Sequence, residues 1–193
     1  NIESVQMDET TKKKYKGEML FIRALTYFNM VRLWGDVPLV IRYFDDPFQT
    51  FGIGRSPVND VYEQIKNDLI EASKILPEVP DNKRLGTAVS GSAKTLLGKV
   101  YLTLKDYDNA VKILKEVIDS QQYTFIQNYT ELFDVDNKNN SESIFEIQYT
   151  EAVTDLGSAF ANLFAPIGSS EVTGGIGATE GNNEPTQNFY ESY

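Results

Sequence analysis

The segment Gly17–Val40 reads GEMLFIRALTYFNMVRLWGDVPLV and contains the strongest helix signal in the chain. At 100° per residue, one helix face is continuously apolar, and Gly35-Asp36 with Pro38 would end the helix. Further apolar residues lie among the polar ones opposite, so packing on more than one side is expected. We therefore predict a buried helix over residues 15–34 in an all-α fold. Its continuous face comprises Leu20, Phe21, Ala24, Tyr27, Phe28, Val31 and Trp34.

Downstream, helical spacing predicts three more helices, over residues 57–76, 87–104 and 107–120. Ser56-Pro57 would cap the first of them. The last two match the spacing of a tetratricopeptide repeat. A glycine there would let the helices approach closely, and two tyrosines would fill the wedge between them. The matching positions are Leu97, Gly98, Tyr101, Tyr107 and Ala110.

The first helix repeats this pattern loosely, with Ala24 at the small position and Tyr27 three residues later. Its partner would be the helix at 57–76, after an inserted loop over residues 37–55. We therefore expect two diverged repeats, over 15–76 and 87–120. Because such units need neighbours to bury their faces, further repeats outside this sequence are expected.

The pattern changes after residue 120. Phe145, Ile147 and Tyr149 alternate with period two, which predicts a short strand at about 143–149. Residues 150–185 are rich in Gly, Ser, Thr and Asn and are interpreted as a long structured loop. The expected fold is an all-α, tetratricopeptide-like superhelix with long loops and this short β element. Residues 1–193 would form one partial domain, with 121–193 as its truncated strand-and-loop part.

Composition excludes several functional classes. A net charge of −10 disfavours binding to nucleic acid or anionic lipid. The 193 residues include no Cys and no His, which removes thiolate chemistry and the commonest general base near neutral pH. Asp and Glu pairs could still cleave glycosides, but none is placed as an acid/base pair by sequence. We assign no catalytic residue, no metal site and no cofactor.

The best binding candidates are aromatic residues in loops, because loops carry function and exposed aromatics need a reason. These are Tyr43, Phe48, Phe51 and Phe164. Packing over the repeat faces remains the alternative for the loop at 43–51. Trp34 could stack on a sugar, but its place on the apolar helix face favours the core. Arg23 and Arg32 could bind an anion, although pairing with Asp or Glu is favoured.

Two further motifs are weak. The segment from Asp134 to Asn140 is similar to a calcium loop but lacks the required Gly and the final Glu, so a solvated turn is favoured. Residues 174–177 read Gly-Gly-Ile-Gly, without the GKS/T of a phosphate-binding loop. We interpret them as a flexible loop or part of a ligand-facing rim.

Several blocks together resemble the SusD/RagB-like family. Arg23-Ala24 and Tyr27-Phe28, followed by Gly35-Asp36-Val37-Pro38, resemble its signature helix and turn. Arg55-Ser56-Pro57-Val58 looks like the next block. Ala93-Lys94 to Ala110, Glu142 to Glu146 and Pro185-Thr186-Gln187 look like later ones, in family order over most of residues 15–190.

The resemblance implies a non-catalytic, surface-exposed lipoprotein of the outer membrane that captures oligo- or polysaccharides. It would hand them to a SusC-like TonB-dependent transporter. Because the chain starts at Asn1 without a visible signal peptide, we expect a piece of a longer protein, lipid-anchored through an N-terminal Cys outside this sequence. The alternatives are a tetratricopeptide adaptor that docks a peptide in its groove and, less favoured, a glycosidase.

Overall fold

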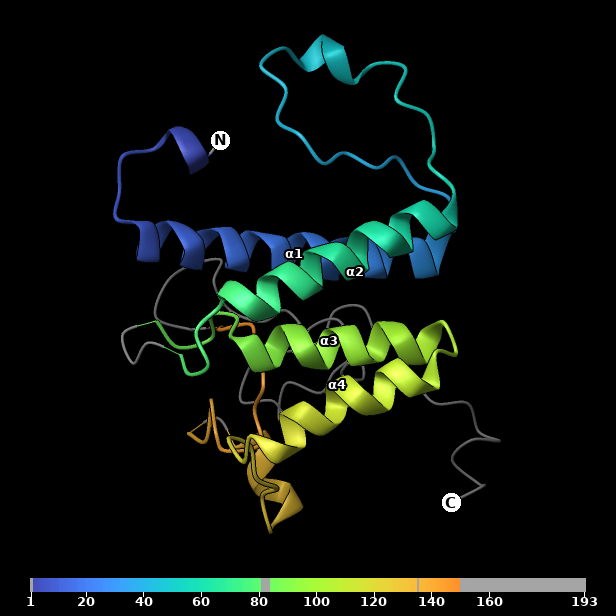
Figure 1. Ribbon diagram of the computed structural model, residues 1–193. Coiled ribbons are helices and arrows are strands. Elements are labelled where there is room, and N and C mark those ends of the chain that lie inside the picture. Colours follow the sequence, from blue (N-terminus) through green and yellow to red (C-terminus); the bar gives the residue numbers. More distant parts are fainter. Residues whose placement is uncertain (1, 81–83, 135, 150–193) are drawn as a thin grey trace, which may run out of the picture. The chain divides into compact units, whose positions relative to one another are not determined.

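The computed structural model describes residues 2–80, 84–134 and 136–149, and its regular elements are helices (Figure 1). Residues 1–146 form one compact unit; of the second, 147–193, only 147–149 are described. The helices are α1 (Glu9–Trp34), α2 (Val58–Ile75), α3 (Ser90–Thr103) and α4 (Tyr107–Asp119). Three short 3-10 helices are η1 (Ile2–Ser4), η2 (Pro47–Thr50) and η3 (Tyr129–Phe133). The prediction of an all-α fold is confirmed.

The helices pack in chain order, with α1 against α2, α2 against α3 and α3 against α4 (Figure 1). The predicted face of α1 forms much of the core, and Ala24 is completely buried. α1 begins earlier than expected, because the Asp8 carboxylate caps it by accepting the Thr11 N–H at 2.9 Å. Helical periodicity therefore predicted the core face correctly from Leu20 to Val31, and placed the start of the helix too late.

Glycines set the closest approach within both helix pairs. A Cβ on Gly98 would collide with the Leu114 side chain of α4. In the first pair, a Cβ on Gly17 would lie 2.8 Å from Cδ2 of Leu76, which directly follows α2. The space that each glycine leaves is filled by a leucine of the partner segment.

Trp34 was expected in the core, but its side chain is 62% exposed in the described part of the chain. It is the last residue of α1, one turn after the buried Val31. The start of α2 lies over Gly35 instead, with Val58 3.9 Å from where a Cβ would be. Periodicity gave the direction of Trp34, but no described element covers that end of the face.

Tyr107 was expected to fill the wedge between α3 and α4, and this prediction is wrong. Its side chain is 59% exposed at the start of α4, whereas Tyr101 is partly buried against the core. Ala110, one turn after Tyr107, is the α4 residue buried against its neighbours there. The first turn of α4 therefore directs its small residue inward and its tyrosine outward.

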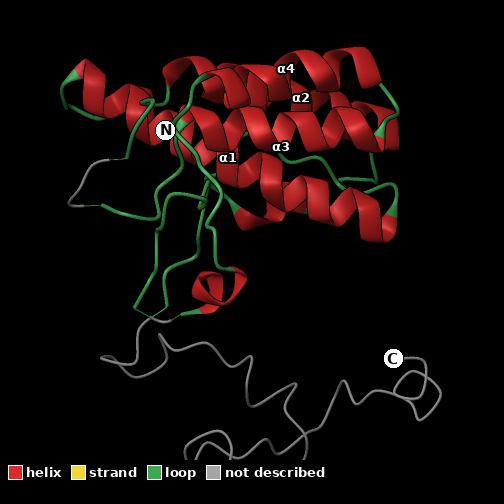
Figure 2. Cartoon of the chain, turned by 90° about the horizontal axis from the view of Figure 1, so that it is seen from below, coloured by secondary structure: helices red, strands yellow, loops and turns green. Residues whose placement is uncertain are grey.

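The strand predicted at about 143–149 is not formed in the described residues (Figure 2). Alternating apolar residues indicate an extended backbone, but a strand also needs a partner for its N–H and C=O groups. Here the Ile144 carbonyl accepts the Ser92 hydroxyl at 2.8 Å. Phe145 packs edge-to-face on Phe21, with ring centroids 4.9 Å apart. The segment is held by the helices rather than by a sheet.

Candidate functional site

The two ends of the loop between α1 and α2 are paired with each other at Val37 and Ser56. We call this pairing the neck. Gly35 has φ +69°, and its N–H caps α1 on the Val31 carbonyl. Asp36 then accepts the Val58 N–H at 2.9 Å, so it caps α2, which was expected to be capped by Ser56. Val37 is buried and pairs with Ser56, whose N–H donates to the Val37 carbonyl at 2.9 Å. The Gly-Asp-Val-Pro turn thus ends one helix, starts the next and joins the two ends of the loop.

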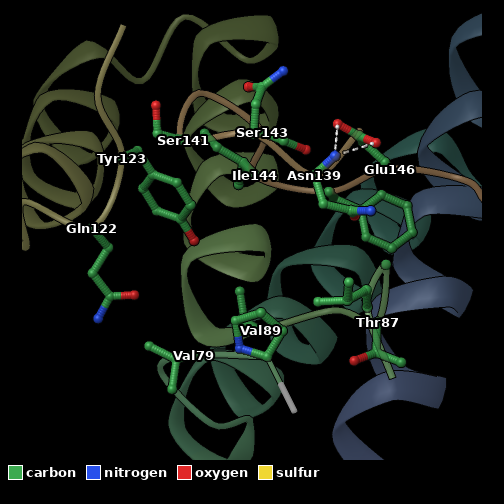
Figure 3. A pocket seen from close by; sticks show the side chains of 15 residues that line it. Val79, Thr87, Val89, Gln122, Tyr123, Asn139, Ser141, Ser143, Ile144 and Glu146 are labelled. Carbon is green, nitrogen blue, oxygen red and sulfur yellow. Dashed lines mark hydrogen bonds between the residues drawn. The ribbon is translucent and has the colours of Figure 1, made fainter. Parts of the chain in front are cut away.

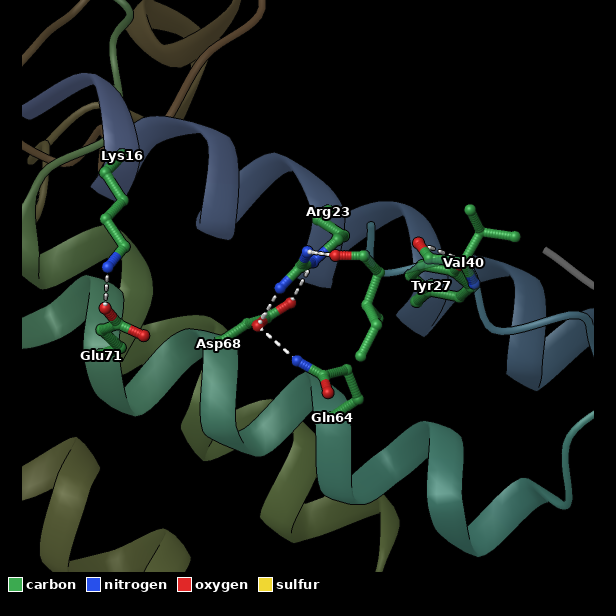
Figure 4. A network of polar contacts seen from close by, with 8 residues as sticks. Lys16, Arg23, Tyr27, Val40, Gln64, Asp68 and Glu71 are labelled. Carbon is green, nitrogen blue, oxygen red and sulfur yellow. Dashed lines mark hydrogen bonds and ion pairs between the residues drawn. The ribbon is translucent and has the colours of Figure 1, made fainter. Parts of the chain in front are cut away.

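An ion pair between the first two helices supports the base of this loop (Figure 4). Arg23 of α1 donates from Nε and Nη2 to the two Asp68 oxygens of α2, both at 2.7 Å. Gln64 donates to the same carboxylate at 2.7 Å, so this buried acid has three hydrogen bonds. Hydrogen bonding to Asp68 raises the pKa of Arg23 above its ordinary value.

Two side chains of α1 then bind the loop backbone directly (Figure 4). The remaining Arg23 nitrogen, Nη1, donates to the Ile41 carbonyl at 3.3 Å. The Tyr27 hydroxyl accepts the Val40 N–H at 2.7 Å and lies 3.3 Å from the Pro38 carbonyl as a donor. The Arg and Tyr of the signature helix are therefore the residues that fix residues 38–41 on the scaffold.

We call Arg23, Tyr27, Asp36 and Asp68, which hold the base of this loop, the clamp. Further along the loop, residues 42–55 present aromatic side chains to solvent. Tyr43, Phe48 and Phe51 are each more than 70% exposed. Phe48 and Phe51 form an edge-to-face pair, with ring centroids 5.5 Å apart, across the short helix η2. Asp46 caps η2 through the Phe48 N–H at 2.9 Å. We call residues 42–55 the aromatic arm, and three of the four predicted binding residues lie on it.

The fourth predicted binding residue, Phe164, lies outside the described residues, as do the glycines at 174–177. Arg32 differs from the expected pairing with a carboxylate. Its Nη2 donates to Asn29 at 2.7 Å, Nε donates to the Phe28 carbonyl, and the guanidinium lies 4.2 Å from the Phe28 ring centroid. Arg23 follows the expectation and Arg32 does not.

A cavity of about 300 Å³ is a second candidate, and no motif in the sequence predicts it (Figure 3). It lies between the α2–α3 connection and the segment after α4. Burial raises the pKa of Tyr123, whose ring packs against Gly91 of α3. The Asn139 N–H donates to both Glu146 oxygens at 3.2 Å, which fixes the opposite wall. The remaining lining is mainly amide, hydroxyl and aliphatic, including Gln122, Ser141, Ser143, Val79 and Val89.

The described residues were also compared with the requirements of a metal centre. Among the residues that the structure describes, no group of three Asp or Glu side chains is arranged to hold a metal ion. In the segment similar to a calcium loop, Asp134 accepts the Asp136 N–H at 3.0 Å, as in an ordinary Asx turn. No described helix is both long and apolar enough to cross a bilayer. The two regions expose aromatic rings that can stack on a ligand, and amide and hydroxyl groups that can form hydrogen bonds with it.

Several proteins with known names have sequences similar to this one. A "SusD-like protein" of Bacteroides ovatus is 32% identical over 190 residues, covering 88% of this chain and 32% of the relative. The starch-binding protein SusD of Bacteroides thetaiotaomicron is 28% identical over 148 residues, covering 73% of this chain and 25% of SusD. The chain therefore spans about a third or less of the curated relatives it matches.

The fold also matches a solved structure, that of a laminarin-binding SusD-like protein. The TM-score is 0.82 at 34% identity, over 87% of this chain and 40% of the other. Residues 1–102, more than half of the chain, match the SusD-like family described as "starch-binding associating with outer membrane". The chain belongs to this SusD-like family.

Proposed function

We propose that the protein captures glycans at the outer membrane without cleaving them, and that the aromatic arm contributes to the binding surface. The observation that carries the proposal is the arm itself: exposed rings of Tyr43, Phe48 and Phe51 on a loop whose base is fixed by Arg23 and Tyr27. Exposed aromatic clusters mark interaction sites on soluble proteins. The family membership and the relatives named for starch and laminarin support a carbohydrate as the ligand.

The chemistry of the arm suits a sugar chain. The C–H faces of a pyranose ring are apolar and pack on aromatic faces, while the hydroxyls need polar partners at the edges. Arg42, whose guanidinium lies 4.7 Å from the Phe44 ring centroid, is a donor within the arm. A net charge of −10 over the chain would repel polyanions, so we expect uncharged polysaccharides to be preferred.

Binding is tested by affinity electrophoresis of the complete protein in gels that contain a panel of uncharged and acidic polysaccharides. We expect retardation in at least one uncharged glycan, and intact recovery of an oligosaccharide of that glycan after incubation. Product release would favour a glycosidase. Binding of peptides but no glycan would favour the tetratricopeptide adaptor.

The role of the arm is tested separately with the double variant F48A/F51A. Loss of two stacking rings should weaken binding by about tenfold or more, since tenfold corresponds to only about 1.4 kcal/mol. F125A is the matched control, because Phe125 is also strongly exposed but lies outside the arm. If F48A/F51A bound as tightly as the wild type, the arm would not be part of the site, although glycan capture could stand.

We further propose that the complete protein is a surface lipoprotein that delivers its ligand to a SusC-like TonB-dependent transporter. The description of the family as associating with the outer membrane supports this location. Purification of the tagged protein from outer membranes should recover such a transporter. Recovery of the protein without any transporter would contradict the delivery step.

A further inference from the structure

The cavity between the α2–α3 connection and the segment after α4 is built differently from the aromatic arm (Figure 3). We call it the Tyr123 cavity. Its described lining lies within residues 79–146, so both walls belong to the same compact unit. Its volume of about 300 Å³ is at the lower end of the range of small-molecule sites, about 300–1,000 Å³. This size favours a ligand of one ring over an extended polymer.

One wall of the cavity is formed by Tyr123. Its ring can lie against α3 because Gly91 has no side chain: a Cβ there would be 2.9 Å from Cε2 of the ring. The Tyr123 hydroxyl makes no hydrogen bond with the residues that the structure describes. Burial raises the pKa of Tyr123, so the phenol is neutral near pH 7 and can both donate and accept. This hydroxyl is therefore available to a ligand.

Two further polar side chains of the cavity are also uncommitted. The Gln122 amide and the Ser143 hydroxyl form no side-chain hydrogen bond within the described part of the chain. By contrast, the Ser141 hydroxyl already donates to the Thr124 carbonyl at 3.2 Å. The cavity thus offers three neutral groups, on Gln122, Tyr123 and Ser143, that can each donate and accept.

The rest of the lining limits the class of ligand. Val79, Val89 and Ile144 provide aliphatic surface. Glu146 is the one charged residue among those described in the lining, and its two oxygens accept the Asn139 N–H at 3.2 Å. An anionic ligand would meet this carboxylate without a compensating cation. The lining therefore suits an uncharged molecule with several hydroxyls and an apolar face.

The Tyr123 cavity is also separate from the aromatic arm. The arm rejoins the helices at the start of α2, and the cavity lies beside the connection that follows the end of α2. The 18 residues of α2 put about 27 Å between these two points. A single ring cannot reach from one to the other.

Building on the proposed capture of glycans, we propose that the Tyr123 cavity binds a single uncharged sugar ring. The ring is either a free monosaccharide or the terminal unit of a glycan. Gln122, Tyr123 and Ser143 form hydrogen bonds with its hydroxyls, and the aliphatic side chains pack on its C–H face. The arm, with exposed rings and no enclosing walls, would contact the side of a chain instead.

Saturation-transfer difference NMR of the complete protein with D-glucose, D-galactose, D-mannose and N-acetyl-D-glucosamine tests this proposal. At least one of these sugars should bind. V79W places an indole at the rim of the cavity and should weaken that binding about tenfold or more. V111W is the matched control, because Val79 and Val111 are 62% and 66% exposed and Val111 lies outside the cavity.

Y123F removes one hydroxyl without changing the shape of the cavity. It should weaken binding of the monosaccharide about fivefold, as expected for the loss of one hydrogen bond. Y43F, which removes an exposed hydroxyl of the arm, should leave this binding unchanged. Binding of none of these sugars would overturn the proposal. Equal binding by V79W and V111W would also overturn it.

The double variant F48A/F51A separates this proposal from the function proposed for the arm. It should weaken the retardation by polysaccharide and leave the affinity for the monosaccharide unchanged. Retardation by polysaccharide without binding of any monosaccharide would refute the cavity site, while glycan capture would stand. Loss of monosaccharide binding in F48A/F51A, with V79W unaffected, would assign the ring to the arm and refute the cavity site.

The two sources of the ring are distinguished with an oligosaccharide of the sugar that binds. In the F48A/F51A background, V79W should weaken binding of the oligosaccharide if the cavity receives the end of a chain. It should weaken binding of the monosaccharide alone if the cavity receives a free sugar. Either result agrees with the proposal, and an effect of V79W on neither ligand contradicts it.

Discussion

The two helix pairs of this chain solve the same packing problem with different connections. In the second pair, α3 passes to α4 within three residues, Leu104 to Asp106, and Lys105 adopts φ +61° in that turn. In the first pair, 23 residues separate α1 from α2, from Gly35 to Pro57. The short connection keeps the adjoining ends of α3 and α4 close together. The long one needs a dedicated clamp, and Arg23, Tyr27, Asp36 and Asp68 supply it.

The first pair combines the packing of the helix scaffold with a loop that we propose to bind ligand. In both pairs a leucine side chain packs against a glycine, Leu76 against Gly17 and Leu114 against Gly98. Both pairs therefore need a residue without a side chain at the point of closest approach. The first pair adds a buried ion pair that the second does not have among the described residues. Arg23 of that ion pair also donates to the Ile41 carbonyl, directly before the aromatic arm. The ion pair therefore connects the loop to the scaffold as well as α1 to α2.

Removing the carboxylate of the clamp should have the largest effect. D68A would leave Arg23 without its bidentate partner, at a cost of about 3 kcal/mol in the free energy of unfolding. E71A is the control, since Glu71 makes a more exposed ion pair with Lys16 across the same helices, and about 0–1 kcal/mol is expected. Urea unfolding measures both. Equal losses would show that the clamp is no more than a surface ion pair.

Substitution of Gly98, the glycine of the second pair, should have the next largest effect on stability. G98A would place a methyl group against Leu114, and the expected net loss is about 1–2 kcal/mol, after the better helix propensity of Ala is included. G17A should cost less, because a Cβ there meets Leu76 less closely. G54A serves as the control, since nothing lies within 4 Å of a Cβ at that loop position. If G98A were as stable as G54A, the close approach of α3 and α4 would not depend on glycine.

The hydroxyl of Tyr27 should have a smaller effect on stability and a visible one on the arm. Y27F removes the acceptor of the Val40 N–H and should cost about 1 kcal/mol. It should also accelerate proteolysis within residues 42–55, while cleavage elsewhere stays unchanged. Y43F, which removes an exposed hydroxyl of the arm, should do neither. Unchanged cleavage in Y27F would show that Arg23 and the neck suffice to hold the arm.

The smallest effect should appear only at high pH. Burial raises the pKa of Tyr62 in the first pair and of Tyr123 beside the second above their ordinary value of 10.0. Because the neutral phenol is favoured in the folded state, this stabilisation is complete below pH 10 and is lost as the pH rises through the folded-state pKa. Y62F and Y123F should each flatten the fall in melting temperature above pH 10. An unchanged slope in either variant would contradict burial of that hydroxyl.

The scaffold was predictable because helical periodicity reports directly on burial. The face from Leu20 to Val31 lies in the core as expected, and the ends of α3 and α4 were placed within a few residues. The errors at Trp34 and Tyr107 share one physical cause. Periodicity tells which way Trp34 and Tyr107 point, but not whether another element covers them.

The candidate site was only partly predictable, because its contacts join distant parts of the sequence. Tyr43, Phe48 and Phe51 could be named from composition, and their exposure is what the proposed binding role requires. The partner of Arg23 lies 45 residues away, and nothing in the local pattern singles out Asp68 from the other acids. The cavity around Tyr123 is formed by two irregular segments, for which no periodic signal exists.

The neck at Val37 and Ser56 has a consequence for how such a protein can change. The two ends of the loop are joined there. The entropic cost of closing the loop therefore depends only weakly on its length, at about 0.6 kcal/mol for each doubling. Residues 42–55 can then be exchanged, lengthened or recoded with little effect on the helices. Because of the neck, the sequence of the arm can change while the free energy of unfolding of the helices stays nearly the same. One scaffold could in this way acquire a new ligand.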